Sequence, residues 1–240
     1  MRIDEDRCIA CLDCIDHCPV GAIKEGTVQG EVFIDQDECV ECDCCLRADV
    51  CGSDAIWQPE LVWPRILRAQ FSNPVWIHPS TGLKGRGIEE IKTNEVRGRY
   101  RRGQIGVAAE LGRPGVGAYF RDVERVLMAI VPLGITFDKD TPIYSLMSNP
   151  ETGKLKEEIL GERVLSAIID FSTTPEKLSS VLKSLHEVSQ QIETVFSVDM
   201  CSLLDPDGTC PAERIAEADG FVMRPNGKNN VGLGRPLAEL

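Results

Sequence analysis

Nine of the eleven cysteines in this 240-residue chain lie within its first 51 positions. Three of them follow one another at intervals of three, and a fourth comes four residues later, directly before a proline: Cys8, Cys11, Cys14 and Cys18. A tight loop with this spacing can place three thiolates around one face of a cubane [4Fe–4S] cluster, while the fourth cysteine of such a run reaches a second cluster. The run therefore predicts iron–sulfur chemistry.

A second run repeats the pattern with three differences. Its regularly spaced members are Cys39, Cys42 and Cys45. Five residues, rather than three, then separate Cys45 from Cys51, and Gly52 stands where proline is usual. The two added residues leave open whether Cys51 is a ligand. Cys44 is an extra cysteine and an alternative to Cys45, although the regular spacing favours Cys45.

Residues 1–58 resemble the bacterial two-[4Fe–4S] ferredoxin family through both runs together. The resemblance implies a pseudo-twofold pair of clusters held by two sets of cysteines: Cys8, Cys11, Cys14 and Cys51 for the first cluster, and Cys39, Cys42, Cys45 and Cys18 for the second. The flanking sequence repeats as well, because residues 19–23 are echoed by residues 52–56. The Ala-Ile pair in each repeat is expected to pack against cluster sulfur and to limit the access of water, which tunes the reduction potential.

Two other uses of clustered cysteines stay open, a structural zinc site built from similar C-x-x-C pieces and a disulfide scaffold. Zinc sites rarely need eight or nine cysteines in an interlocked order. Disulfides suit a secreted chain, but residues 1–6 are acidic and lack the apolar stretch of a signal peptide. No run approaches 18 apolar residues. We therefore expect a cytoplasmic chain without a membrane span.

The net charge of −12 is unevenly distributed along the chain. Residues 1–60 hold 4 basic and 15 acidic side chains, whereas residues 61–120 hold 10 basic and 4 acidic ones. An acidic module beside a basic segment predicts electrostatic docking, either within the chain or onto a partner. A solvated surface without a partner is the alternative for the basic segment.

Composition and periodicity divide the chain into four parts. We expect a ferredoxin domain at residues 1–58, a connector rich in proline and tryptophan at 59–94, an α+β sandwich at 95–204 and a glycine-rich tail at 205–240. Four prolines in the connector disfavour regular helix and favour an extended path.

The α+β part alternates between strand and helix patterns. Period-two alternation predicts strands at 104–111, 135–137 with 143–147, 164–171 and 194–200, and apolar stripes predict helices at 119–131 and 175–192. The order β-α-β-β-α-β is typical of the split-βαβ, ferredoxin-like sandwich, with two helices on one face of a four-stranded antiparallel sheet. That name concerns topology and implies no iron.

Glycine- and arginine-rich loops are the remaining candidate binding elements. They lie at 82–87, at the basic run 97–102, and at a repeated Leu-Gly-Arg-Pro word at 111–114 and 233–236. Their backbone N–H groups could cradle an anion, and plain turns are the alternative. A single basic run on an acidic chain is thin support for nucleic-acid binding, so we expect no nucleic-acid partner.

Residues 85–94 with the two Leu-Gly-Arg-Pro words resemble the region that follows the ferredoxin motifs in 6-hydroxynicotinate reductases, iron–sulfur flavoproteins that reduce a hydroxypyridine ring. The resemblance implies that this chain delivers electrons to a ring reductase, with the substrate chemistry elsewhere. No catalytic motif of those enzymes maps onto this chain residue by residue. A flavin is left open as a further cofactor, and no motif supports it.

The leading hypothesis is an electron-transfer component that delivers low-potential electrons to a partner protein or catalytic subunit. The sandwich would then serve for docking or for homo-oligomer formation. The alternatives are a reductase that itself binds flavin or substrate, and a redox-sensing regulator. No catalytic residue is assigned, because the histidines stand singly and no nucleophile has a supporting set: His17, His78 and His186. Cys201 and Cys210 are interpreted as free thiols, with a redox pair as the alternative.

Overall fold

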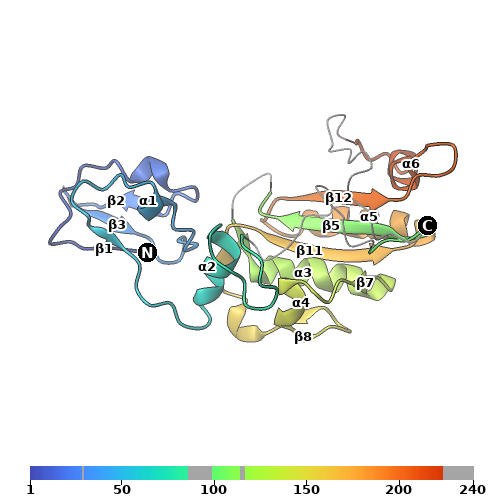
Figure 1. Cartoon of the computed structure of the whole chain (residues 1–240), viewed down its shortest axis with the longest axis horizontal. Coiled ribbons are helices and arrows are strands. Elements are labelled where there is room, and N and C mark those ends of the chain that lie inside the picture. The colour runs from blue at the N-terminus through green and yellow to red at the C-terminus, as the bar shows by residue number, and fades with distance from the viewer. Residues whose placement is uncertain (29, 86–98, 114–116, 224–240) are drawn as a thin grey trace.

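A small lobe carries both cysteine runs and forms one end of the elongated molecule (Figure 1). The structure is a computed structural model and describes residues 1–28, 30–85, 99–113 and 117–223. Two short antiparallel strand pairs build this lobe: β1 (Arg2–Ile3) with β4 (Ile56–Trp57), and β2 (Ile23–Glu25) with β3 (Val32–Ile34). A short helix lies in each cysteine run, η1 (Ile15–His17) and α1 (Cys44–Arg47).

The apolar core of the small lobe is minor, and cysteine side chains are part of it. Its buried members are Met1, Ala22, Ile23, Val32, Ile34, Cys39, Cys45 and Ile56. The strands of this lobe are only two or three residues long, so each can bury at most one or two side chains. We expect a lobe with so little core to depend on bound metal for its stability, as other small metal-binding domains do.

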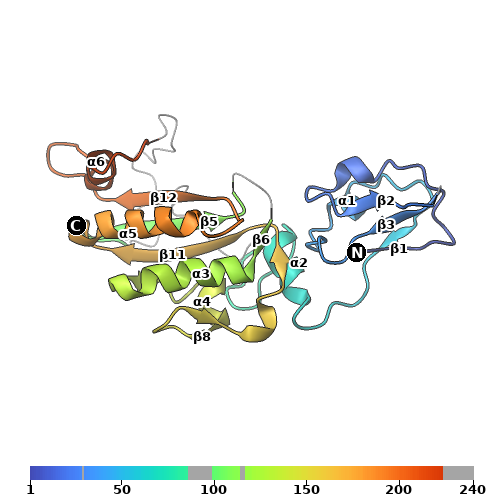
Figure 2. The same cartoon turned by 180° about the vertical axis from the view of Figure 1, so that it is seen from behind.

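The larger lobe is organised around a four-stranded sheet. Its strands are β5 (Ile105–Leu111), β7 (Thr136–Phe137), β11 (Ala167–Thr173) and β12 (Phe196–Ser202). They are arranged in the order β12-β5-β11-β7, and every neighbouring pair is antiparallel. Helix α3 (Phe120–Ile130) lies between β5 and β7 in the chain, and α5 (Pro175–Ser189) lies between β11 and β12. Figure 2 shows both helices against one face of the sheet.

The main core fills the space between this face and the two helices. Alternate residues of β5 enter it, because successive side chains of a strand point to opposite faces: Ile105, Val107, Ala109 and Leu111. The helices contribute apolar residues at intervals of three and four: Val123, Val126, Leu127 and Ile130 from α3, and Leu178, Val181, Leu182, Leu185 and Val188 from α5. Both stripes match the periodicity in the sequence.

Smaller elements complete the larger lobe. They are α2 (Ile66–Ser72), β6 (Ala118–Tyr119), η2 (Val131–Leu133), α4 (Pro142–Leu146), β8 (Met147–Asn149), β9 (Lys154–Leu155), η3 (Glu157–Ile159), β10 (Arg163–Val164) and α6 (Pro211–Ala218). None of the helices in the described part of the chain is long and apolar enough to cross a membrane.

Three local expectations are wrong. Residues 143–146 form helix α4 rather than a strand, because Pro142 suits the first helical turn and Ile143 and Leu146, three residues apart, reach the core together. The tail contains helix α6, whose Ala212 and Ala216 are buried four residues apart. The strand expected at 164–171 is divided between β10 and β11.

A fourth expectation is also wrong. Residues 59–94 include helix α2 instead of being extended throughout. The prolines at 64 and 74 flank this helix, so none interrupts its hydrogen bonds. Phe71 packs edge-on against Phe120, with ring centroids 5.3 Å apart. The Ser72 hydroxyl oxygen accepts a 2.8 Å hydrogen bond from the backbone N–H of Leu165. Helix α2 therefore belongs to the core of the larger lobe, and the expected boundary at residue 94 lies outside the described residues.

We predict that Phe71→Ala destabilises the larger lobe by about 3–5 kcal/mol, since it removes a fully buried aromatic ring and leaves a cavity. Urea unfolding followed by far-ultraviolet circular dichroism would measure the loss. Val62→Ala is the control, because Val62 is exposed and should cost about 0.5 kcal/mol or less. Equal effects of the two variants would show that α2 is not part of this core.

Candidate metal centres

The first cysteine run lines a pocket together with Cys51. About 330 Å³ of space, part of it open to solvent, lies between the atoms that line this pocket. Its cysteines are Cys8, Cys11, Cys14 and Cys51, and its other lining side chains are mostly apolar: Ile3, Ile9, Ala10, Leu12, Val32, Val50, Ser53, Ala55 and Ile56. Despite the two added residues before it, Cys51 therefore lines the same pocket as the cysteines of the first run. The residues extend the segment after α1, where Asp49 adopts a left-handed backbone conformation.

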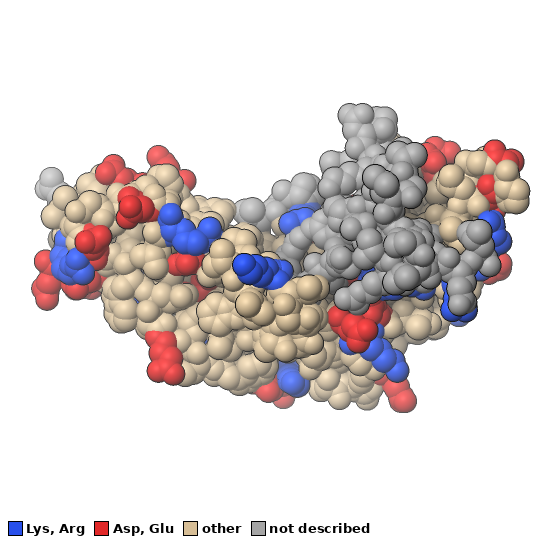
Figure 3. Space-filling view, in the orientation of Figure 1, with Lys and Arg blue, Asp and Glu red and all other residues tan. Residues whose placement is uncertain are grey.

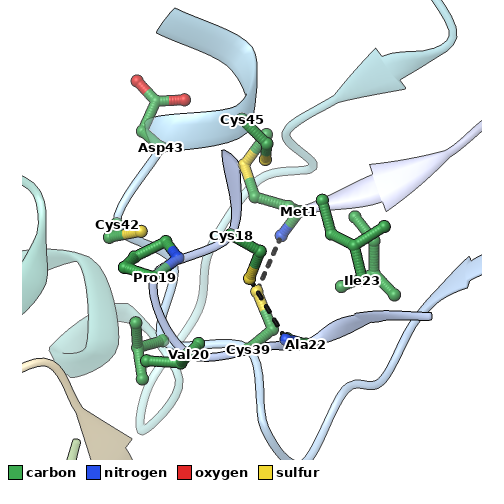
Figure 4. Close-up of a pocket in the computed structure, with 12 residues that line it drawn as sticks. Met1, Cys18, Pro19, Val20, Ala22, Ile23, Cys39, Cys42, Asp43 and Cys45 are labelled. Carbon is green, nitrogen blue, oxygen red and sulfur yellow. Dashed lines mark hydrogen bonds between the residues drawn. The ribbon is translucent and has the colours of Figure 1, made fainter. Parts of the chain in front are cut away.

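The second run lines another pocket together with Cys18 (Figure 4). About 300 Å³ of space, part of it open to solvent, lies between its lining atoms, and its cysteines are Cys18, Cys39, Cys42 and Cys45. Apolar residues again make up most of the remaining lining: Met1, Pro19, Val20, Ala22, Ile23, Ile34, Val40 and Asp43. The structure thus brings together the two four-cysteine sets that the resemblance implies, and their role as iron ligands stays a prediction.

Cys44 lies beside the second pocket rather than in its lining. Its side chain interacts with Cys42, and its sulfur lies 3.7 Å from the Arg47 guanidinium. Cys45, one residue on in α1, is buried and lines the pocket. The placement therefore favours Cys45 over Cys44 as the third ligand of this run.

Left-handed backbone conformations shape both loops at matching positions. Ala10 and Leu12 flank Cys11 with φ values of 53° and 68°, and Glu41 and Asp43 flank Cys42 with φ values of 54° and 64°. Such residues cost about 1–3 kcal/mol each when they are not glycine, and they cluster at ligand sites. Alternation of right- and left-handed residues directs successive N–H groups into one concavity, an arrangement that recurs at iron–sulfur sites. The cysteine spacing alone does not reveal these four positions.

Each pocket also receives one matched hydrogen bond to sulfur. The backbone N–H of Ala22 donates to the Cys18 sulfur at 3.1 Å, and that of Ala55 donates to the Cys51 sulfur at 3.2 Å. A partial positive charge on an N–H group stabilises a thiolate, and bonds of this kind help to set the potential of an iron–sulfur centre. The Ala-Ile repeats thus lie in the pocket linings, as expected, and the alanines also act through their backbone.

Burial affects the pKa of thiols in both pockets, and most strongly in the second. Loss of contact with water raises the pKa of Cys42 and of Cys45 to about 12, and it also raises the pKa of Cys14. Burial acts in the same direction on Cys51, but hydrogen bonds from Ser53 and Ala55 outweigh it and lower that pKa. In the absence of metal, Cys42 and Cys45 are therefore protonated at neutral pH. Metal binding has to displace these protons, so it becomes more favourable as the pH rises.

The donor set fits a [4Fe–4S] cluster in each pocket better than it fits the alternatives. Within the described residues, no three His, Cys, Asp or Glu side chains converge closely enough to hold a single metal ion. All eleven cysteines lie in the described part of the chain, and no disulfide joins any of them there, which does not match a disulfide scaffold. Four sulfurs around an apolar space suit a larger metal–sulfur body, since thiolates are the usual ligands of such clusters.

Arginines of the larger lobe surround the loop of the second pocket. Arg65 pairs with the buried Glu41 at 2.7 Å, and Arg68 donates to the backbone carbonyl of Cys39 at 2.7 Å. Arg163 forms an ion pair with Glu38, and it also interacts electrostatically with Cys18. The basic segment of the sequence thus contacts the acidic small lobe within the same chain, through Arg65 and Arg68. Arg163 lies outside the basic segment, and no pattern in the sequence indicated its role.

Glu41 is the buried acid of this contact. Burial alone would raise its pKa, but the amino group of Met1 and the guanidinium of Arg65 reverse the effect and lower it. Its carboxylate therefore stays ionised at neutral pH and anchors the loop to Arg65.

The other candidate residues do not form a site in the described structure. His17 is exposed in η1. His78 is buried beside Phe71, which lowers its pKa to about 4, and His186 packs edge-on against Phe221. Cys201 lies in β12 and Cys210 lies near Ser202. The expected anion loops fall largely outside the described residues, which exclude 86–98, 114–116 and 224–240.

Comparison with known proteins agrees with this geometry. Residues 1–24 match the family described as 4Fe-4S binding domain. A ferredoxin of Alicyclobacillus acidocaldarius subsp. acidocaldarius is 46% identical over 50 residues, which cover 21% of this chain and 59% of that protein. A ferredoxin of Rickettsia felis (strain ATCC VR-1525 / URRWXCal2) is 36% identical over 76 residues, which cover 30% of this chain and 66% of that protein. No solved structure matches the chain significantly.

The chain therefore carries a 4Fe–4S binding domain at its amino terminus, and it is similar to ferredoxins in that part. The matched regions span about 59% and 66% of the two relatives, so the likeness leaves part of each relative unmatched. The family match ends at residue 24 and includes only the first cysteine run.

We predict that Cys45→Ser reduces the iron content by about four atoms per chain, since serine cannot replace the thiolate of one cubane. Cys44→Ser should keep the full iron content, and it provides a control one residue away in the same helix. Iron and acid-labile sulfide, measured after anaerobic purification, would test both variants. Iron loss in Cys44→Ser and retention in Cys45→Ser would reverse the assignment.

We also predict that Arg163→Gln makes the potential of one of the two centres more negative, on the order of 50 mV. The substitution removes a positive charge near Cys18 and leaves Glu38 without its partner, and both changes disfavour an added electron. Redox titration followed by electron paramagnetic resonance would resolve the shift. Arg121→Gln is the control, because Arg121 stacks on the same Tyr119 ring that lies near Arg163. An equal shift of both centres in Arg163→Gln would contradict the local effect.

Proposed function

We propose that the chain is an iron–sulfur electron-transfer protein that holds two [4Fe–4S] clusters and delivers low-potential electrons to a catalytic partner. Cys8, Cys11, Cys14 and Cys51 would hold one cluster, and Cys18, Cys39, Cys42 and Cys45 the other. When bound, each cluster supplies a centre that accepts and releases one electron. The chain's own residues exclude water, donate hydrogen bonds to sulfur and set the surrounding charge.

The observation that carries this proposal is the pair of apolar pockets, each lined by four cysteines drawn from both runs. The strongly acidic sequence of residues 1–60 favours potentials in the negative part of the iron–sulfur range, because added negative charge disfavours reduction. A likeness to ferredoxins in the same part of the chain supports the same class.

The role of the larger lobe follows from its topology and remains part of the proposal. The strand order β12-β5-β11-β7, with helices α3 and α5 on one face, supports a split-βαβ sandwich. We propose that this sandwich serves as a platform for a catalytic partner or a second copy of the chain. From the resemblance in sequence, the acceptor would be a reductase of a heteroaromatic ring in a reducing cytoplasm.

The proposal predicts about eight iron and eight sulfide atoms per chain after anaerobic preparation. Electron paramagnetic resonance of the dithionite-reduced protein should show two interacting [4Fe–4S]⁺ signals, since the two pockets share one small lobe. About four irons with a single uncoupled signal would reduce the proposal to one cluster. A chain that contains zinc and no iron would overturn it.

A further inference from the structure

The two cysteine loops are equivalent in sequence but differ in their exposure. Cys8, Cys11 and Cys14 recur 31 residues later as Cys39, Cys42 and Cys45. In the first loop Ile9 is 71% exposed, whereas its counterpart Val40 is 0% exposed. Cys11 is exposed at the middle of the first loop, whereas Cys42 is buried at the middle of the second.

Among the described residues, the larger lobe makes its side-chain contacts at the second loop, and these contacts account for the difference. Arg68 of α2 donates to the carbonyl oxygens of Gln36, Asp37 and Cys39 at 2.7 to 3.1 Å. Arg65 pairs with Glu41, whose side chain is 0% exposed. A partner protein that approaches in solution therefore reaches sulfur at the first pocket and is blocked from the corresponding side of the second.

The exposed loop has an apolar centre and an acidic surround. Leu12 is 38% exposed close to Ile9 in the sequence. The segments at 4–18 and 46–54, which carry the cysteines of this pocket, hold six exposed carboxylates and two exposed arginines: Glu5, Asp6, Asp13, Asp16, Asp49 and Asp54 against Arg7 and Arg47. Figure 3 shows acidic side chains along the upper and outer edge of the small lobe.

We infer that the loop around Ile9 and Leu12 is the docking surface for a redox protein whose own surface presents basic residues around an apolar centre. Opposite charges steer such a partner and raise its association rate. The apolar centre allows close contact over the first cysteine pocket. This inference rests on the proposed electron-transfer function, and it places the exchange of electrons at the small lobe instead of at the sandwich.

The test uses the full chain, reduced anaerobically and freed of excess dithionite. Ferric cytochrome c, a basic haem protein, is the probe, and each haem takes up one electron as the chain loses one. The double variant Asp13→Asn with Asp16→Asn should slow haem reduction about three- to tenfold at low ionic strength. The difference should vanish near 1 M salt, where the Debye length is about 3 Å.

A matched control removes the same number of charges far from the loop. Glu213 and Glu217 are exposed on α6, at the opposite end of the molecule from the small lobe (Figure 1). Glu213→Gln with Glu217→Gln should leave the rate within about twofold of that of the unaltered chain. The apolar centre is tested by Ile9→Gln, which should slow the reaction at every salt concentration, with Val195→Gln as its exposed control.

Iron content and electron paramagnetic resonance spectra of every variant distinguish a failure of the proposed electron-transfer function from a failure of the proposed docking surface. If the unaltered chain lacks iron–sulfur signals, the proposed function fails. If the signals are intact and the two double variants react equally fast, the docking surface is overturned while the proposed function stands. Equal slowing of both double variants would show an effect of net charge alone, and it would also overturn the docking surface.

Discussion

The small lobe depends on one constraint, the placement of cysteine sulfurs around two apolar pockets, of which the second pocket buries three of its four cysteines. Burial makes isolated thiolates costly, and it raises the pKa of Cys42 and Cys45 to about 12. Each pocket contains features that offset this cost. A backbone N–H group donates a hydrogen bond to one cysteine sulfur. Left-handed residues curve the loop backbone around the pocket. With short strands and a minor apolar core, the lobe has little else to hold it together.

The larger lobe breaks the symmetry of the repeat. It binds one loop through Arg65, Arg68 and Arg163 and leaves the other loop in contact with solvent. Two sites with nearly the same cysteine geometry therefore have different surroundings, one dry and close to guanidinium groups, the other exposed and surrounded by carboxylates. If clusters occupy both pockets as proposed, both differences would act on reduction potential and on access. The larger lobe would then influence the chemistry of the small lobe through its arginines.

Sequence patterns predicted those features that depend on local spacing. Cysteines three residues apart indicate a metal-binding loop wherever it is placed. The exchange of Cys18 and Cys51 between the two runs was implied by the family resemblance and not by the spacing, which left Cys51 open. The apolar stripes of α3 and α5 and the alternation in β5 are equally local. Helix α2 was missed because the prolines of the connector disfavour helix, whereas Pro64 and Pro74 flank this helix. Residues 143–146 were assigned to a strand from their apolar pattern, although Pro142 suits the first turn of α4. The glycine-rich composition of the tail gave no indication of α6.

The sequence by itself indicated the class of chemistry and most of the larger sheet, because both depend on residue types at fixed separations. The grouping of the cysteines into two sets of four was implied by the family resemblance, and the spacing left Cys51 open. Only the tertiary structure decided which loop is covered and that Arg163 reaches Glu38 across the lobes. These are contacts between separate elements of the fold, such as Arg68 with Cys39 and Arg163 with Glu38. No local spacing encodes them, because they depend on how separately formed elements pack together.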